Sequence, residues 1–112
     1  MSTLAEQVCE PCSKNAQPLS QNEAQEQLKS LSQWQIVEHD GIMKLSRSFS
    51  FCDFASALVF TQRVGEIAEQ AGHHPVIITE WGKSTVTWWT HAINGLHPND
   101  FILAARTDEV VE

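Results

Sequence analysis

The segment from Asp53 to Pro75 constrains the fold more than any other part of the sequence. Its apolar and small residues recur at spacings of three and four, which is typical of one face of an α-helix; they are Phe54, Ala57, Leu58, Thr61, Val64, Ala68 and Ala71. Asp53 is a suitable N-cap, Gly72 can adopt the left-handed conformation that ends a helix, and Pro75 blocks continuation. The sequence therefore predicts one long helix that ends just before His73 and His74.

The regions on both sides of this helix have the pattern of β-hairpins. In residues 34–51, two alternating runs flank a His-Asp-Gly turn at 39–41. Residues 76–90 are rich in β-branched and aromatic side chains, and residues 80–83 in their middle suit a turn. Arg47 has the same parity as the apolar residues of its strand, so either the strand is irregular there or the guanidinium reaches a sheet edge.

Two shorter helices complete the predicted fold. Ser20 and Glu23 form a capping-box pair, and the helix-forming run after them continues for about three turns, to Leu31. Later, the Asn-Gly pair at 94–95 breaks the chain, and Pro98 suits the first turn of a closing helix. The predicted order is α-β-β-α-β-β-α. Without β-α-β alternation, this order favours an α+β fold, in which a four-stranded antiparallel sheet carries its helices on one face.

Length and charge limit what the protein does. The 112 residues suit one domain, and because residues 1–18 show no hydrophobic period, we expect a poorly ordered leader before a folded domain at 19–112. A formal net charge of −7, with scattered lysines and arginines, argues against a nucleic-acid partner. No apolar stretch approaches the roughly 18 residues of a membrane span, and the start lacks a signal-peptide pattern. We therefore expect a cytoplasmic protein without a membrane partner.

The three cysteines do not form a complete disulfide framework, because their number is odd. Cys9 and Cys12 have the spacing of a zinc or redox pair, but no second closely spaced pair follows to complete four zinc ligands. A loosely packed tail is the favoured interpretation of this segment. The alternative is a metal site that His73 and His74 help to complete.

A specific combination of residues follows the long helix. The run Glu-Gln-Ala-Gly-His-His-Pro at 69–75 is followed by Trp81, His91 and Asp100. These residues and their spacing resemble the signature of the pterin-4a-carbinolamine dehydratases, and the similarity covers about residues 20–108. The bacterial members, which work beside phenylalanine hydroxylase, are the most similar.

The resemblance implies a function. Such a lyase removes water from 4a-hydroxytetrahydrobiopterin to give quinonoid dihydropterin, and so recycles the pterin of an aromatic amino acid hydroxylase. It requires no metal or redox cofactor. The resemblance also implies a homodimer or homotetramer.

Three positions depart from the pattern of the animal members. Gly72 stands where an acidic residue commonly precedes the histidine pair, and Trp89 stands where a small hydroxyl residue precedes the Thr-His pair at 90–91. His97 occupies a position where threonine often caps the last helix. None of the three departures replaces a histidine of the signature.

The family resemblance and the chemistry of imidazole together assign roles to the three histidines. Histidine has an ordinary pKa of about 6.5, so that it can donate a proton in one step and accept one in another near neutral pH. We expect His73 and His91 to transfer protons and His74 to contact the substrate.

Further residues are candidates for the substrate-binding set, which comprises His74, Glu69, Thr90 and Asp100. Glu69 lies one turn before His73, where it could orient an imidazole, although a solvated helical carboxylate is the alternative. Asp100 matches the signature, but its place in the first turn of a helix also fits capping, which is the favoured role. Trp81 and Trp88 could stack on a pterin, yet tryptophans in hairpins are more often core residues.

Two other functions stay open. One is a non-catalytic dimerisation, coactivator or assembly module of the same fold, against which the intact histidine trio argues. The other is a metal-dependent hydrolase built on His73, His74 and His91, with the Cys9–Cys12 pair as further ligands.

Overall fold

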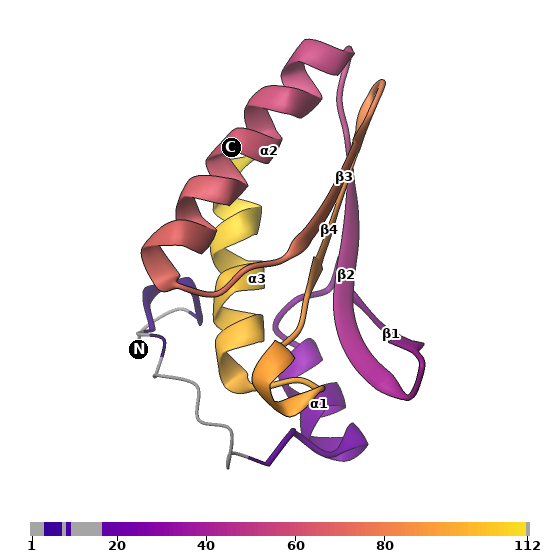
Figure 1. Ribbon diagram of the computed structural model, residues 1–112, viewed down its shortest axis with the longest axis vertical. Helices are drawn as coiled ribbons and strands as arrows, with labels where there is room; N and C mark the ends of the chain where they lie inside the picture. The colour runs from indigo at the N-terminus through magenta and orange to yellow at the C-terminus, as the bar shows by residue number, and fades with distance from the viewer. Residues whose placement is uncertain (1–3, 8, 10–16, 112) are drawn as a thin grey trace.

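The computed structural model describes residues 4–7, 9 and 17–111, and it confirms the predicted α+β fold and order of elements (Figure 1). The helices are α1 (Gln21–Leu28), α2 (Phe54–Ala71) and α3 (Pro98–Val110), and the strands are β1 (Gln35–His39), β2 (Ile42–Ser50), β3 (Val76–Glu80) and β4 (Lys83–Trp88). Two short 3-10 turns, η1 (Leu4–Glu6) and η2 (His91–Ile93), precede α1 and follow β4.

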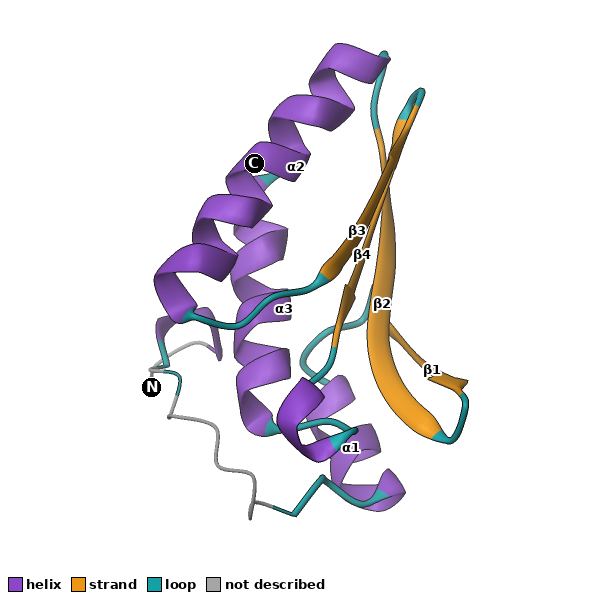
Figure 2. Cartoon of the chain, in the orientation of Figure 1, coloured by secondary structure: helices purple, strands orange, loops and turns teal. Residues whose placement is uncertain are grey.

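The four strands form one antiparallel sheet in the order β1-β2-β4-β3. The two hairpins join through β2 and β4, in a register that places Leu45 opposite Trp88. Helices α2 and α3 lie side by side over one face of the sheet (Figure 2), and both contact its strands. On the other face of the sheet the central residues are small and polar, with Ser46 and Ser48 of β2 opposite Thr87 and Thr85 of β4.

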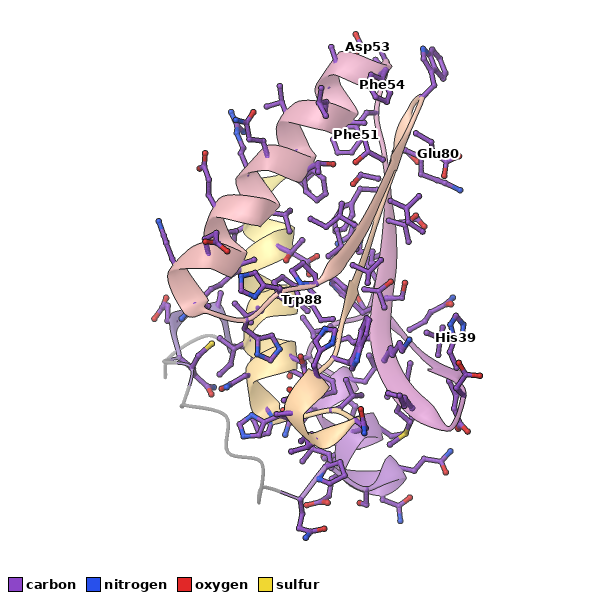
Figure 3. The ribbon with its side chains drawn as sticks, in the orientation of Figure 1. His39, Phe51, Asp53, Phe54, Glu80 and Trp88 are labelled. Atoms are coloured by element: carbon purple, nitrogen blue, oxygen red, sulfur yellow. The ribbon has the colours of Figure 1, made fainter. Side chains whose placement is uncertain are left out.

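The core lies between this sheet and the helices. Its fully or nearly buried side chains come from inward-facing strand positions and from α2 and α3: Leu45, Phe49, Val86, Trp88, Phe60, Val64, Phe101 and Leu103. Full burial of such a side chain contributes about 1.5–3 kcal/mol each. Figure 3 shows Trp88 between sheet and helices, where its indole N–H donates to the Thr107 hydroxyl at 3.2 Å.

Helix α2 begins and ends at the predicted residues. The Asp53 carboxylate accepts a hydrogen bond from the Ser56 backbone N–H at 2.7 Å, which holds the pKa of Asp53 below its ordinary value. Gly72 has a φ of +62°, and its N–H bonds to the carbonyls of the last turn. A left-handed residue of this kind is readily supplied by glycine, and it turns the chain out of the helix.

Helix α1 is shorter than predicted. Its capping box between Ser20 and Glu23 is confirmed, but the helix ends at Leu28 after eight residues, so the expectation of about three turns to Leu31 was wrong. The backbone instead forms successive turns, in which the N–H of Leu31 bonds to the carbonyl of Leu28 at 2.9 Å and that of Trp34 to Leu31 at 3.0 Å. These turns bury Leu31 and Trp34.

At Arg47 the structure shows neither an irregular strand nor a guanidinium at a sheet edge, so both expectations were wrong. Strand β2 runs through it without interruption, with Arg47 opposite Val86, and β2 is a central strand. The guanidinium reaches α3, where it bonds to the Asp108 carboxylate at 2.6 Å, and the Trp34 indole N–H donates to the same oxygen at 2.9 Å. The Arg47 guanidinium on the core side of the sheet is therefore paired with a carboxylate of α3. A charge that is largely removed from water is destabilising unless it has such a partner.

The part of the leader that the structure describes has contacts with α3. Arg106 donates from Nε to the carbonyl of Ala5 at 3.0 Å and from Nη2 to that of Gln7 at 2.5 Å. Cys12 and most of the predicted leader lie outside the described residues, so the proposed boundary at residue 18 stays a prediction. Within the described part of the chain, no helix is both long enough and apolar enough to cross a membrane.

Candidate active site

Two chain segments meet beside the N-terminus of α3 and form a pocket. One is the exit from α2, and the other follows β4. The pocket has a volume of about 250 Å³ and is lined by Gly72, His73, His74, Thr90, His91 and Ala92. Three histidines and Thr90, which the sequence singled out, thus share one cavity.

Local backbone geometry brings these segments together. The left-handed Gly72 lets the N–H of His73 bond back to the Ala68 carbonyl at 3.1 Å, so the histidine pair follows the helix end directly. After β4, Thr90 pairs with Gly95 in an isolated bridge, with the Thr90 N–H bonded to the Gly95 carbonyl at 2.8 Å. This bridge closes the loop that carries His91.

His73 is held by a buried carboxylate. Its Nε2 lies 2.7 Å from Oδ1 of Asp100, and the two side chains are 8% and 0% exposed. The other carboxylate oxygen, Oδ2, accepts from the Thr90 hydroxyl at 2.8 Å and from the His97 backbone N–H at 2.9 Å. A carboxylate beside Nε2 favours the tautomer with a proton on that nitrogen and fixes the plane of the ring.

Asp100 therefore has two structural tasks. Its bond to the His97 N–H is one half of the capping box of α3, and the His97 imidazole supplies the other half by accepting from the Asn99 N–H at 3.0 Å. Its bonds to His73 and Thr90 connect this helix end to the pocket. The capping role that the sequence favoured for Asp100 is confirmed, and the contact with His73 is one that spacing alone did not indicate.

His74 is held in a different way. Its Nε2 lies 2.5 Å from Oε1 of Glu69, and both side chains are largely exposed. The expected interaction of Glu69 with an imidazole thus exists, but its partner is His74 and not His73. Because the pair is solvated, it contributes at most about 1 kcal/mol to stability.

His91 is exposed, in the short turn η2, and its ring packs against the indole of Trp89, with centroids 4.3 Å apart. Neither Trp81 nor Trp88 lines the pocket. Trp88 is in the core, and Trp81 is 73% exposed at the turn between β3 and β4. The contact of Trp89 with His91 was not predicted, because two consecutive tryptophans in a sequence do not show which one faces the core.

No group of three or more His, Cys, Asp and Glu side chains is arranged to hold a metal ion, as far as the described residues extend.

Comparison with known proteins identifies the family to which the chain is similar. A family model described as "Pterin 4 alpha carbinolamine dehydratase" matches residues 17–110. A protein of Chlorobaculum tepidum, named "Putative pterin-4-alpha-carbinolamine dehydratase", is 52% identical over 99% of this chain and 100% of its own. A protein of Marinobacter nauticus with the same name is 51% identical over 98% of this chain and 99% of its own.

Two solved structures are also similar. A "transcriptional coactivator/pterin dehydratase" from Brucella melitensis is 33% identical, with a TM-score of 0.77 over 85% of this chain and 99% of that one. A "pterin dehydratase-like protein", described as a RuBisCO assembly factor, is 20% identical, with a TM-score of 0.58 over 69% and 87%, and shares the fold. By the family match and the identity to its relatives over almost their full length, this chain belongs to the pterin-4a-carbinolamine dehydratase family.

Proposed function

We propose that this protein dehydrates 4a-hydroxytetrahydrobiopterin to quinonoid dihydropterin in the pocket of His73, His74 and His91. The observation that carries the proposal is the buried pair of His73 and Asp100, which fixes one imidazole within a cavity that two further histidines line. An oriented imidazole is well suited to repeated proton transfer near neutral pH.

The reaction needs two proton transfers and no redox change. The nitrogen next to carbon 4a forms a C=N bond with its electron pair as the bond from carbon 4a to oxygen breaks. One imidazolium gives a proton to the departing hydroxyl, which leaves as water, and a neutral imidazole accepts the proton that the ring releases. We assign these transfers to His73 and His91; such assistance accelerates reactions by about 10²–10⁴-fold.

In this proposal the other candidate residues either contact the substrate or hold a histidine in place. His74, oriented by Glu69, contacts the substrate, while Thr90 and Asp100 support His73 from behind through their mutual hydrogen bond. No metal or redox cofactor takes part. In the cell, we place the reaction in the cytoplasm, where it returns oxidised pterin to a hydroxylase of phenylalanine.

A non-catalytic role is the second candidate, because the Brucella relative is described as a transcriptional coactivator as well as a pterin dehydratase. A direct assay separates the two. Carbinolamine, generated by a pterin-dependent hydroxylase, is followed by its absorbance as it decays with and without the protein. We expect faster decay in proportion to protein concentration, with His73→Gln as the inactive control. Decay at the uncatalysed rate would leave the non-catalytic module as the function.

We also propose that the chain forms a homodimer or homotetramer through α2. Three large apolar side chains, Phe54, Leu58 and Val59, are 44–49% exposed on this helix. Val59 also lines a pocket of about 310 Å³ between α2 and the end of α3, and Figure 3 shows Phe54 at the far end of the molecule from α1. A cluster of exposed apolar side chains marks an interaction surface.

Light scattering after size exclusion tests this association. We expect a mass of two or four times the 12.6 kDa chain, and a shift to the monomer in Leu58→Glu, because a carboxylate in an apolar interface lacks solvation. Gln70→Glu, at an exposed position about three turns further along the same helix, is the matched control and should not change the mass. A monomeric wild-type protein would contradict the proposal.

A further inference from the structure

The three histidines of the pocket differ in what orients them. His73 is held by Asp100 and His74 by Glu69, each through an imidazole nitrogen. Within the described part of the chain, the imidazole of His91 has no hydrogen bond or ion pair. Its recorded contact is the ring of Trp89, with centroids 4.3 Å apart and ring planes inclined by 34°.

Trp89 is itself fixed by the sheet. Strand β4 ends at Trp88, which is buried opposite Leu45 of β2. Trp89 follows the strand directly, is partly buried and packs against the hydrophobic core, and Lys44, the neighbour of Leu45, lies beside it. The Lys44 ammonium lies 4.1 Å from the centroid of the Trp89 ring, a cation–π contact that restricts the indole.

We propose that Trp89 is a positioning residue, whose indole orients the imidazole of His91 for proton transfer. The inference rests on the proposed dehydration and identifies what replaces a carboxylate partner at the third histidine. A general acid or base must stay within hydrogen-bond reach of the proton it transfers, so a freely rotating imidazole loses part of its effect. The stacked indole limits that rotation without removing a nitrogen of His91 from use. Trp89 touches His91 and does not line the pocket.

The first test is independent of activity. In proton–carbon correlation spectra of the histidine rings, a ring stacked on an indole has its protons shifted to higher field. The signals of His91 are identified by their loss in His91→Gln. We expect the upfield shift to disappear in Trp89→Leu and to be largely restored in Trp89→Phe, which keeps an aromatic face. Trp81→Leu, the same change at an exposed tryptophan of the distant hairpin turn, should leave the His91 signals unchanged.

The second test measures catalysis in the same variants. We expect Trp89→Leu to lower kcat about tenfold, less than the full general acid–base contribution of 10²–10⁴-fold, with KM changed by less than about twofold. Trp89→Phe should recover most of the loss, and Trp81→Leu should not differ from the wild type. Thermal melting, followed by circular dichroism, checks that each variant is folded.

The outcomes separate the two proposals. An unchanged His91 shift in Trp89→Leu would overturn the inference, and so would a lost shift with an unchanged kcat. A wild-type protein without dehydratase activity would instead contradict the proposed function, and the spectra would still decide whether Trp89 orders His91.

Discussion

Asp100→Asn will lower kcat for carbinolamine dehydration by about 10²-fold while leaving KM within a few-fold of the wild type. The amide keeps the size of the carboxylate but has one acceptor oxygen in place of two. The three donors at Asp100, from His73, Thr90 and His97, can then no longer all be satisfied. The His73 ring thereby loses the charge that fixes its tautomer and its plane.

Stability should fall as well. A hydrogen bond to a buried charged group contributes about 1.5–3 kcal/mol, so the loss of one donor should lower the free energy of unfolding by about 2 kcal/mol. Urea denaturation measures this change. Asp100→Ala removes the cap together with every contact of the carboxylate, and its expected loss of about 4 kcal/mol is a large part of a typical 5–15 kcal/mol total. The amide variant is therefore the informative one for catalysis.

Asp108→Asn is the matched control for this prediction. Asp108 is on the same helix and also accepts from two partners, Arg47 and Trp34, but it lies outside the pocket. We expect it to lower stability and to leave kcat unchanged. The double variant Asp100→Asn/His73→Gln should have a kcat only slightly below that of the more impaired single variant, because Asp100 acts through His73. Fully multiplicative losses would show that Asp100 has a separate role in the reaction.

Most of the fold could be predicted from the sequence, because the residues that begin and end its helices and turns act on their immediate neighbours in the chain. The limits of α2 follow from Asp53 and Gly72, which act within one turn of the helix. The pairing of β2 with β4, which joins the two hairpins, could not be predicted. The alternation of side chains indicates which face of the sheet each one occupies, but not which strand lies beside it. The same limit explains Arg47, whose partner Asp108 is 61 positions away.

In the candidate site, too, local features could be predicted and contacts between distant residues could not. Motif spacing identified the three histidines, but not the partner that each one has. Asp100 is 27 positions from His73 and reaches it only because α3 begins beside the pocket. Glu69 contacts His74 and not His73, which depends on the direction of the chain after the left-handed Gly72. The ring contact of Trp89 with His91 depends on which of two adjacent tryptophans enters the core.

If His73 and His91 transfer the protons, single replacement of either should lower kcat by about 10²–10³-fold and change KM little, since the interaction is lost in the transition state and not on binding. His73→Gln is preferred to alanine, because its amide N–H can still donate to the buried Asp100 carboxylate and avoids leaving that group unsatisfied. His91 is exposed, so His91→Ala should not affect folding. His74→Ala should instead raise KM, as expected for a residue that contacts the substrate.

The double variant of His73 and His91 gives the decisive comparison. If one imidazole donates the proton to the departing hydroxyl while the other accepts the proton from the ring, the two act as one unit. Removing both should then lower kcat by less than the product of the two single reductions. Steady-state kinetics of all four proteins, with circular dichroism to confirm the fold, measures this coupling. Turnover near the wild-type rate in a folded double variant would rule out histidine acid–base catalysis in this pocket. Multiplicative losses would show that the two imidazoles act in independent steps.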